Sequence, residues 1–127
     1  MTKPANFETA FSQLKSVFDT HIARLSVKEN SSAEFTVHTK SASPFPQHKG
    51  QPIFFGSVRV GKAYVSFHLM PLYMNASLTK TISPALKKRM QGKTCFNFKT
   101  APDPHLLSEL QRLTDAGVKQ WTEKKWL

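Results

Sequence analysis

The chain is short of cysteine, of acidic residues and of long apolar runs. It has one cysteine, Cys95, and eight acidic residues against 18 lysines and arginines. A single cysteine excludes an internal disulfide. No stretch approaches the roughly 18 consecutive apolar residues that cross a bilayer, and the N-terminus lacks the apolar core of a signal peptide. We therefore expect a cytoplasmic protein with no membrane partner.

Sequence motifs that specify a reaction are also missing. The sequence contains no Gly-rich phosphate loop and no paired-carboxylate signature of a hydrolase. Its five histidines are scattered, without the HxxxH or Cys-pair spacing of metal sites. We therefore predict no catalytic residues, no metal ligands and no cofactor.

What is present describes a basic, globular domain. The 127 residues carry a formal net charge of +10, and a hydrophobic fraction of 39% with ten phenylalanines is enough for a compact core. The length fits one domain, residues 1–127. A positive charge of this size favours anionic partners but says nothing about the fold.

The N-terminal half predicts one helix followed by three strands. Apolar residues recur at helical spacing from Phe7 to about Leu25. A polar stretch at residues 28–32 then ends the helix. Strand-like alternation follows in three segments, with a tight two-residue hairpin between the last two: 35–39, 53–60 and 63–70.

The C-terminal half predicts a short helix, a strand and a long helix. Ser83, followed by proline, has the residue type of a helix N-cap, and Gly92 can close that helix in the left-handed conformation. A strand at residues 94–99 follows, and Asp103 then starts a helix whose apolar stripe ends at Trp121. The whole pattern predicts an α+β fold: an antiparallel sheet of about four to five strands, covered on one face by the N- and C-terminal helices, with a short helix between strands.

The most informative segment is residues 83–99, SPALKKRMQGKTCFNFK, where a cationic helix leads into an aromatic strand. Ammonium groups beside the free N–H groups of a helix N-terminus can hold a phosphate or a carboxylate. The alternative is a solvated basic face without a ligand. The predicted ligand-binding set consists of four basic residues and two residues of an adjacent pocket: Lys87, Lys88, Arg89 and Lys93, with His68 and Tyr73.

Nucleic acid is a weaker prediction for the anionic partner than a small molecule or a protein. Phe96 and Phe98 can stack on bases, but their alternation along a strand is more typical of core positions. The sequence leaves monomer and homodimer open, because Trp126 fits both an exposed interface and a frayed C-terminus.

A second hypothesis is a small enzyme or redox-sensitive protein that uses Cys95 and His68. His68 shares a strand face with Ser66, and Cys95 shares one with Asn97, so the four side chains meet if the two strands pair. A Cys–His pair can supply a nucleophile and its base. No acid that would orient the histidine is evident. The alternative is a hydrogen-bonded histidine beside a packed cysteine.

Two blocks of sequence resemble a known family. YVSFHLMPLY (residues 64–73) and ISPALKKRMQGKTCFNFK (residues 82–99), with PIFFGSVRVGK before them, are similar to bacterial YdhG-like small proteins with a domain of unknown function. The similarity covers residues 50–121 well and the first helix loosely. The resemblance implies a single α+β domain with an antiparallel sheet flanked by helices, and no established catalytic residues.

The same resemblance provides a third hypothesis. Some YdhG-like proteins are described as frataxin-like intracellular iron chaperones, and frataxin-type proteins present an acidic ridge on a helix and a strand edge. This chain is strongly basic, so iron binding is kept only as an alternative. The leading hypothesis is a non-enzymatic binding protein that takes an anionic ligand or partner.

Overall fold

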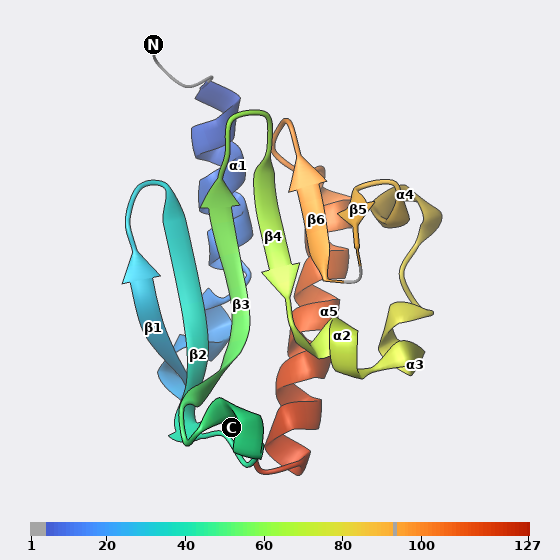
Figure 1. Ribbon diagram of the computed structural model, residues 1–127. Coiled ribbons are helices and arrows are strands. Elements are labelled where there is room, and N and C mark those ends of the chain that lie inside the picture. The colour runs from blue at the N-terminus through green and yellow to red at the C-terminus, as the bar shows by residue number, and fades with distance from the viewer. Residues whose placement is uncertain (1–4, 93) are drawn as a thin grey trace.

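The computed structural model describes residues 5–92 and 94–127, and its centre is one antiparallel sheet in the strand order β1-β2-β3-β4-β6-β5 (Figure 1). The α+β class predicted from the sequence is confirmed. The sheet has six strands, slightly more than the four to five expected. The strands are β1 (Leu25–Asn30), β2 (Glu34–Ala42), β3 (Pro52–Val60), β4 (Val65–Leu69), β5 (Met90–Gln91) and β6 (Cys95–Phe98).

Two long helices, α1 (Ala5–Ser16) and α5 (Pro104–Glu123), lie against the same face of this sheet, behind it in Figure 1. The opposite face is the one that Figure 1 presents to the viewer. Shorter helical segments connect the strands: η1 (Asp19–Arg24), η2 (Pro46–His48), α2 (Pro71–Met74), α3 (Ala76–Thr79) and α4 (Pro84–Lys87).

Helix α5 begins and packs as its sequence predicts. The Asp103 carboxylate accepts a hydrogen bond from the Leu106 backbone N–H at 3.0 Å, which satisfies one of the free donors at the helix start. Its buried stripe then runs to Trp121, whose ring meets the edge of Phe55 at 5.2 Å between ring centres. This stripe attaches the helix to the sheet.

Side chains alternate across the sheet in the predicted way. Phe67 and Phe96 are buried on the helix side, and Phe18 stacks on Phe67 with 5.2 Å between ring centres. Half-buried polar side chains point to the other side: Ser66, His68, Cys95 and Asn97. The core therefore lies between the sheet and the two long helices, and the opposite sheet face is polar.

The first helix is shorter than the sequence predicts. It ends at Ser16, and the chain continues as η1 and then as β1, so the expected helix to Leu25 is wrong. Strand β1 buries only Leu25, because it is an edge strand held by backbone pairing with β2. An edge strand of this kind lacks the alternation that identifies a strand in a sequence.

Two turns also differ from expectation. The connection between β3 and β4 spans residues 61–64, closed by the Gly61 N–H donating to the Tyr64 carbonyl at 2.8 Å, so it is longer than a two-residue hairpin. Gly92 is left-handed, with φ of 76°, but it does not close the helix. Helix α4 ends at Lys87, and Gly92 lies in the turn between β5 and β6.

The C-terminus returns to the core. Trp126 packs edge-on against Phe45 at 5.2 Å and against Trp121 at 5.4 Å between ring centres. Its ring therefore contacts aromatic residues of its own chain. Within the described ranges, no helix is both long enough and apolar enough to cross a membrane.

Candidate functional site

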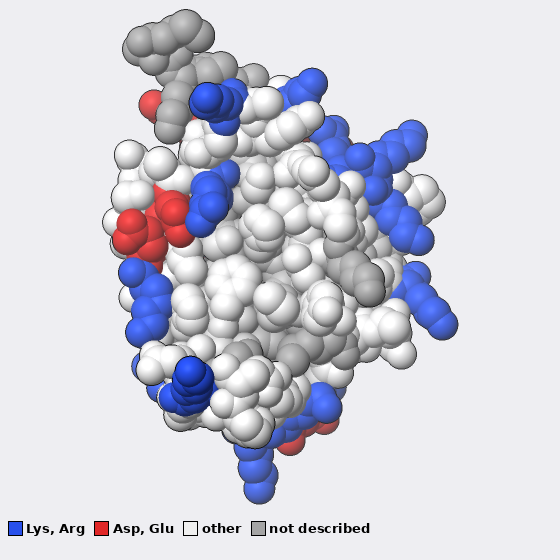
Figure 2. All heavy atoms as spheres, in the orientation of Figure 1, with Lys and Arg blue, Asp and Glu red and all other residues white. Residues whose placement is uncertain are grey.

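The sheet face opposite the long helices carries a row of uncharged polar side chains. The strand register places one residue from each of five strands side by side across this face: Thr36, Ser57, His68, Cys95 and Gln91. Figure 2 shows that the centre of this face is largely free of Lys, Arg, Asp and Glu, which lie around its edges. The charged side chains of this face therefore lie at the rim of the sheet.

His68 and Cys95 lie opposite each other on β4 and β6, so the pairing on which the Cys–His hypothesis depends is present. Burial, with a smaller contribution from the charge of Arg59, lowers the pKa of His68 below its ordinary value. Burial raises the pKa of the Cys95 thiol, and a hydrogen bond with Ser66 only partly opposes this. A thiolate–imidazolium pair needs the opposite shifts, so the geometry does not activate the thiol.

A chain of hydrogen bonds leads along this face to the sheet edge. The Ser66 hydroxyl donates to Asn97 Oδ1 at 2.8 Å, and the Cys95 thiol donates to the same oxygen at 3.5 Å. The Asn97 amide nitrogen then donates to Gln91 Oε1 at 2.8 Å. Because the Gln91 oxygen is the acceptor, its NH₂ group remains as a donor at the exposed end of the chain.

Helix α4 is anchored to α5 by a carboxylate. The predicted cap is confirmed: Ser83 Oγ accepts from the Leu86 N–H at 3.2 Å. Glu109 accepts from the backbone N–H of Ser83 at 2.7 Å and from its hydroxyl at 2.6 Å. Glu109 therefore occupies the Ser83 N–H, one of the backbone donors that the sequence left free for an external anion.

Beyond α4 the surface forms a hollow of about 430 Å³ lined by three cations, Lys88, Arg89 and Lys99. Its other lining residues include Tyr64 and Gln91, and none is acidic. The Lys99 ammonium lies 5.7 Å from the centre of the Tyr64 ring, close enough for a cation–π contact. The hollow thus combines positive charge with an aromatic ring and an amide donor.

Among the described residues, these three cations have no acidic partner within 4.0 Å. In the described part of the chain, the ion pairs within 4.0 Å join His21 to Asp115, Arg59 to Glu34 and Arg112 to Glu109. Figure 2 shows lysines and arginines gathered along the edge of the molecule where α4, β5 and β6 lie. Over residues 5–92 and 94–127, no ion pair neutralises the positive charge of the hollow.

The predicted binding residues are divided among several places. Lys88 and Arg89 line the hollow, whereas Lys87, the last residue of α4, is not among its lining residues. Lys93 lies outside the described residues. Tyr73 lines a separate pocket whose histidine is His38. His68, on the polar sheet face, lines neither this cavity nor the basic hollow, so a pocket shared by His68 and Tyr73 stays a prediction.

Sequence reasoning left Tyr64 and Lys99 out of the binding set. Tyr64 comes directly before β4 and Lys99 comes directly after β6. The register pairs Val65, the first residue of β4, with Phe98, the last residue of β6. Antiparallel pairing places the residues just outside such a pair at the same end of the sheet. The predicted strand boundaries indicate that Tyr64 and Lys99 lie close together, but only if the two strands are known to be neighbours.

No protein-family model, curated protein or solved structure matches this chain. The resemblance to YdhG-like proteins stays a prediction, and function is argued from geometry. Across residues 5–92 and 94–127, no three His, Cys, Asp or Glu side chains gather into a group that could hold a metal ion. The iron-chaperone hypothesis therefore receives no support from the geometry.

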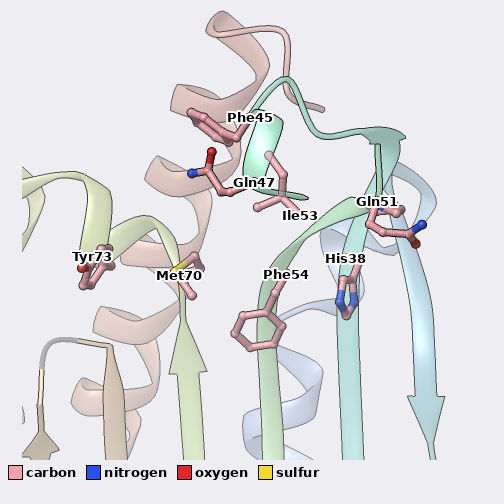
Figure 3. Close-up of a pocket in the computed structure, with 9 residues that line it drawn as sticks. His38, Phe45, Gln47, Gln51, Ile53, Phe54, Met70 and Tyr73 are labelled. Atoms are coloured by element: carbon pink, nitrogen blue, oxygen red, sulfur yellow. The ribbon is translucent and has the colours of Figure 1, made fainter. Parts of the chain in front are cut away.

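A second cavity, of about 450 Å³, lies at the other end of β4. Phe54 and His38, on neighbouring strands, form one wall, and Met70 and Tyr73 form another (Figure 3). The segment between β2 and β3, which includes Phe45, closes the end. This cavity is mostly apolar and is separate from the basic hollow.

Proposed function

We propose that this chain is a non-enzymatic binding protein that holds an anionic group of its ligand in the hollow lined by Lys88, Arg89 and Lys99. The observation behind this proposal is that three cations from two separate segments converge on one hollow and have no acidic partner in the part of the chain that the structure describes. Unpaired cations that share a concave surface attract anions more strongly than the same charges spread over a convex one.

The chemistry of the lining suits an oxyanion. The guanidinium of Arg89 can donate two parallel hydrogen bonds to a phosphate or a carboxylate. Lys88 and Lys99 add compact positive charges, and the Gln91 amide adds a neutral N–H donor. The Tyr64 ring at the rim offers an apolar surface to the part of the ligand next to its anionic group.

A purely solvated basic face explains the arrangement less well. Solvated lysines are normally extended into water and independent of one another. Here Lys99 lies over the Tyr64 ring, and Arg89 lies 5.7 Å from the centre of the Phe98 ring. The contact with Tyr64 holds the Lys99 ammonium at the hollow before any ligand binds, and the contact with Phe98 restricts the Arg89 side chain.

The enzyme hypothesis has weaker support. The Cys95 thiol and the His68 imidazole share a face, but burial favours the neutral form of each. No hydrogen bond joins them, since the thiol donates to Asn97 instead. We therefore place binding, not catalysis, at this end of the sheet.

Calorimetric titration with inorganic pyrophosphate tests the proposal. We expect saturable binding at low salt that weakens as sodium chloride is added, and a loss of at least about tenfold in affinity for Arg89→Gln. Lys119→Gln, which removes an exposed cation from α5, is the matched control and should bind as the parent does. Equal affinities for the two variants, or no saturable binding at low salt, would refute it.

A further inference from the structure

We propose that the apolar cavity bounded by Phe54, Met70 and Tyr73 is a second binding site, for a small uncharged aromatic compound. It lies beyond the C-terminal end of β4, whereas Tyr64 and the basic hollow lie at the N-terminal end. The site is therefore independent of the proposed anion site. A concave, mostly apolar cavity with a few polar groups is the usual form of a small-molecule site.

The residues that line the cavity disfavour a charged ligand. None of the nine lining residues is a lysine, arginine, aspartate or glutamate. A charged ligand would lose its hydration without gaining a partner, which is costly. Three aromatic rings, Phe45, Phe54 and Tyr73, and the thioether of Met70 offer instead the contacts that a flat aromatic ring prefers.

His38 supplies a polar contact without adding charge. Burial, with a smaller contribution from the charge of Lys28, lowers the pKa of His38 below its ordinary value of 6.5, so the ring is neutral at neutral pH. Its Nδ1 atom is buried and has no hydrogen-bond partner. A buried N–H without an acceptor is rarer than a buried lone pair, so we assign the proton to Nε2, which makes the imidazole a donor toward a ligand hydroxyl or carbonyl.

The cavity is held open by its surrounding structure. The Ser43 N–H donates to the Gln51 carbonyl at 2.9 Å, and the Phe45 N–H donates to Ser43 Oγ at 3.0 Å. The Phe45 ring also packs against Trp126. Because these contacts fix the segment between β2 and β3, a ligand does not have to order it on binding.

The aromatic contacts of Trp126 make its indole N–H signal a reporter of ligand binding. Trp121 and Trp126 are the two tryptophans of the chain, and Trp126 touches Phe45 on the cavity wall. Their indole N–H groups give two separate signals in a nitrogen–proton correlation spectrum. A ligand beside Phe45 should shift the signal of Trp126 more than that of the buried Trp121.

The experiment is a titration of the full chain with 2-naphthol, followed in that spectrum. We expect saturable shifts with a Kd of about 1 mM or tighter, the range for a fragment of this size. Tyr73→Ser should weaken binding at least about fivefold, because it removes one wall. Val27→Ser, at an exposed apolar position of the edge strand β1 that lines neither cavity, is the control and should leave binding unchanged.

A second ligand and a second wall variant distinguish this site from the proposed anion site. 2-Naphthalenesulfonate has the same rings with a negative charge, and we expect it to leave the Trp126 signal unchanged at the same concentrations. Phe54→Ala removes a second wall and should reproduce the loss seen with Tyr73→Ser. The proposal is overturned if 2-naphthol gives no saturable shift, if both wall variants bind like the parent, or if the sulfonate occupies this cavity equally well.

Discussion

Glu109 reaches from α5 to the first turn of α4 and accepts two hydrogen bonds from Ser83, one from its backbone N–H at 2.7 Å and one from its hydroxyl at 2.6 Å. The Glu109 side chain is only 13% exposed, and Ser83 in turn caps the Leu86 N–H. This contact fixes the start of the segment that continues into Lys88 and Arg89. The position of the basic hollow thus depends on a carboxylate outside it.

Replacing Glu109 with alanine should lower the free energy of unfolding by about 2 kcal/mol, because hydrogen bonds to a charged acceptor are among the stronger ones and Ser83 would lose its partner. Glu123→Ala, at an exposed position of the same helix, should change stability by less than about 0.5 kcal/mol. Urea denaturation measures both. Similar losses for the two variants would contradict the anchoring role.

Gly117→Ala should destabilise the protein although alanine favours helices. An added Cβ would lie 2.8 Å from Cβ and Cγ of Pro71, whose ring cannot rotate away. The overlap costs about 1–3 kcal/mol, which exceeds the helix-propensity gain of about 1 kcal/mol. Ser108→Ala, on the exposed side of α5, isolates the propensity effect and should be neutral or stabilising. A rise in melting temperature for Gly117→Ala would show that α2 and α5 are not in close contact.

Acid should destabilise the fold through His38 and His68. Burial lowers the pKa of each below 6.5 in the folded state, so the unfolded chain binds more protons and the unfolding free energy falls as the pH drops below that value. The pKa of Glu34 is lowered as well, but this affects the unfolding free energy only below about pH 4.5, the ordinary pKa of a glutamate. Denaturation between about pH 5 and pH 7 should therefore show a slope that the double variant His38→Gln, His68→Gln reduces. A slope identical in the parent and the double variant would assign the effect to other groups.

The Cys95 thiol should react slowly with a disulfide reagent. Burial raises its pKa, so less thiolate is present at neutral pH than in the unfolded chain. We expect the native rate to be at least about tenfold below the rate in denaturant. His68→Ala should leave the native rate unchanged, because the thiol donates to Asn97 and not to His68. A large fall in rate for this variant would support the enzyme hypothesis instead.

The features that the sequence predicted are those set by neighbouring residues. Ser83 and Asp103 cap helices because a side-chain oxygen reaches an N–H three residues ahead. The alternation of β4 and β6 placed His68 and Cys95 on the polar face, and the long apolar stripes predicted two covering helices. These local rules, with the single sheet they imply, are why the α+β class could be predicted.

The features that the sequence missed depend on residues far apart in the chain. A helix N-terminus attracts any anion. Nothing local in the sequence indicates that the Glu109 carboxylate, 26 residues after Ser83, would accept the Ser83 N–H at the start of α4. Edge strand β1 is held by backbone pairing, so its side chains gave no signal.

The sequence by itself determined the fold class, the caps, the polar strand face and the excess of positive charge. Only the tertiary structure decided which charges converge. Lys99 joins Lys88 and Arg89 because β6 folds back between β4 and β5. His38 and Tyr73 line one cavity because β3 pairs with both β2 and β4. Strand order and register are properties of the packed chain, whereas propensity and alternation belong to each segment alone.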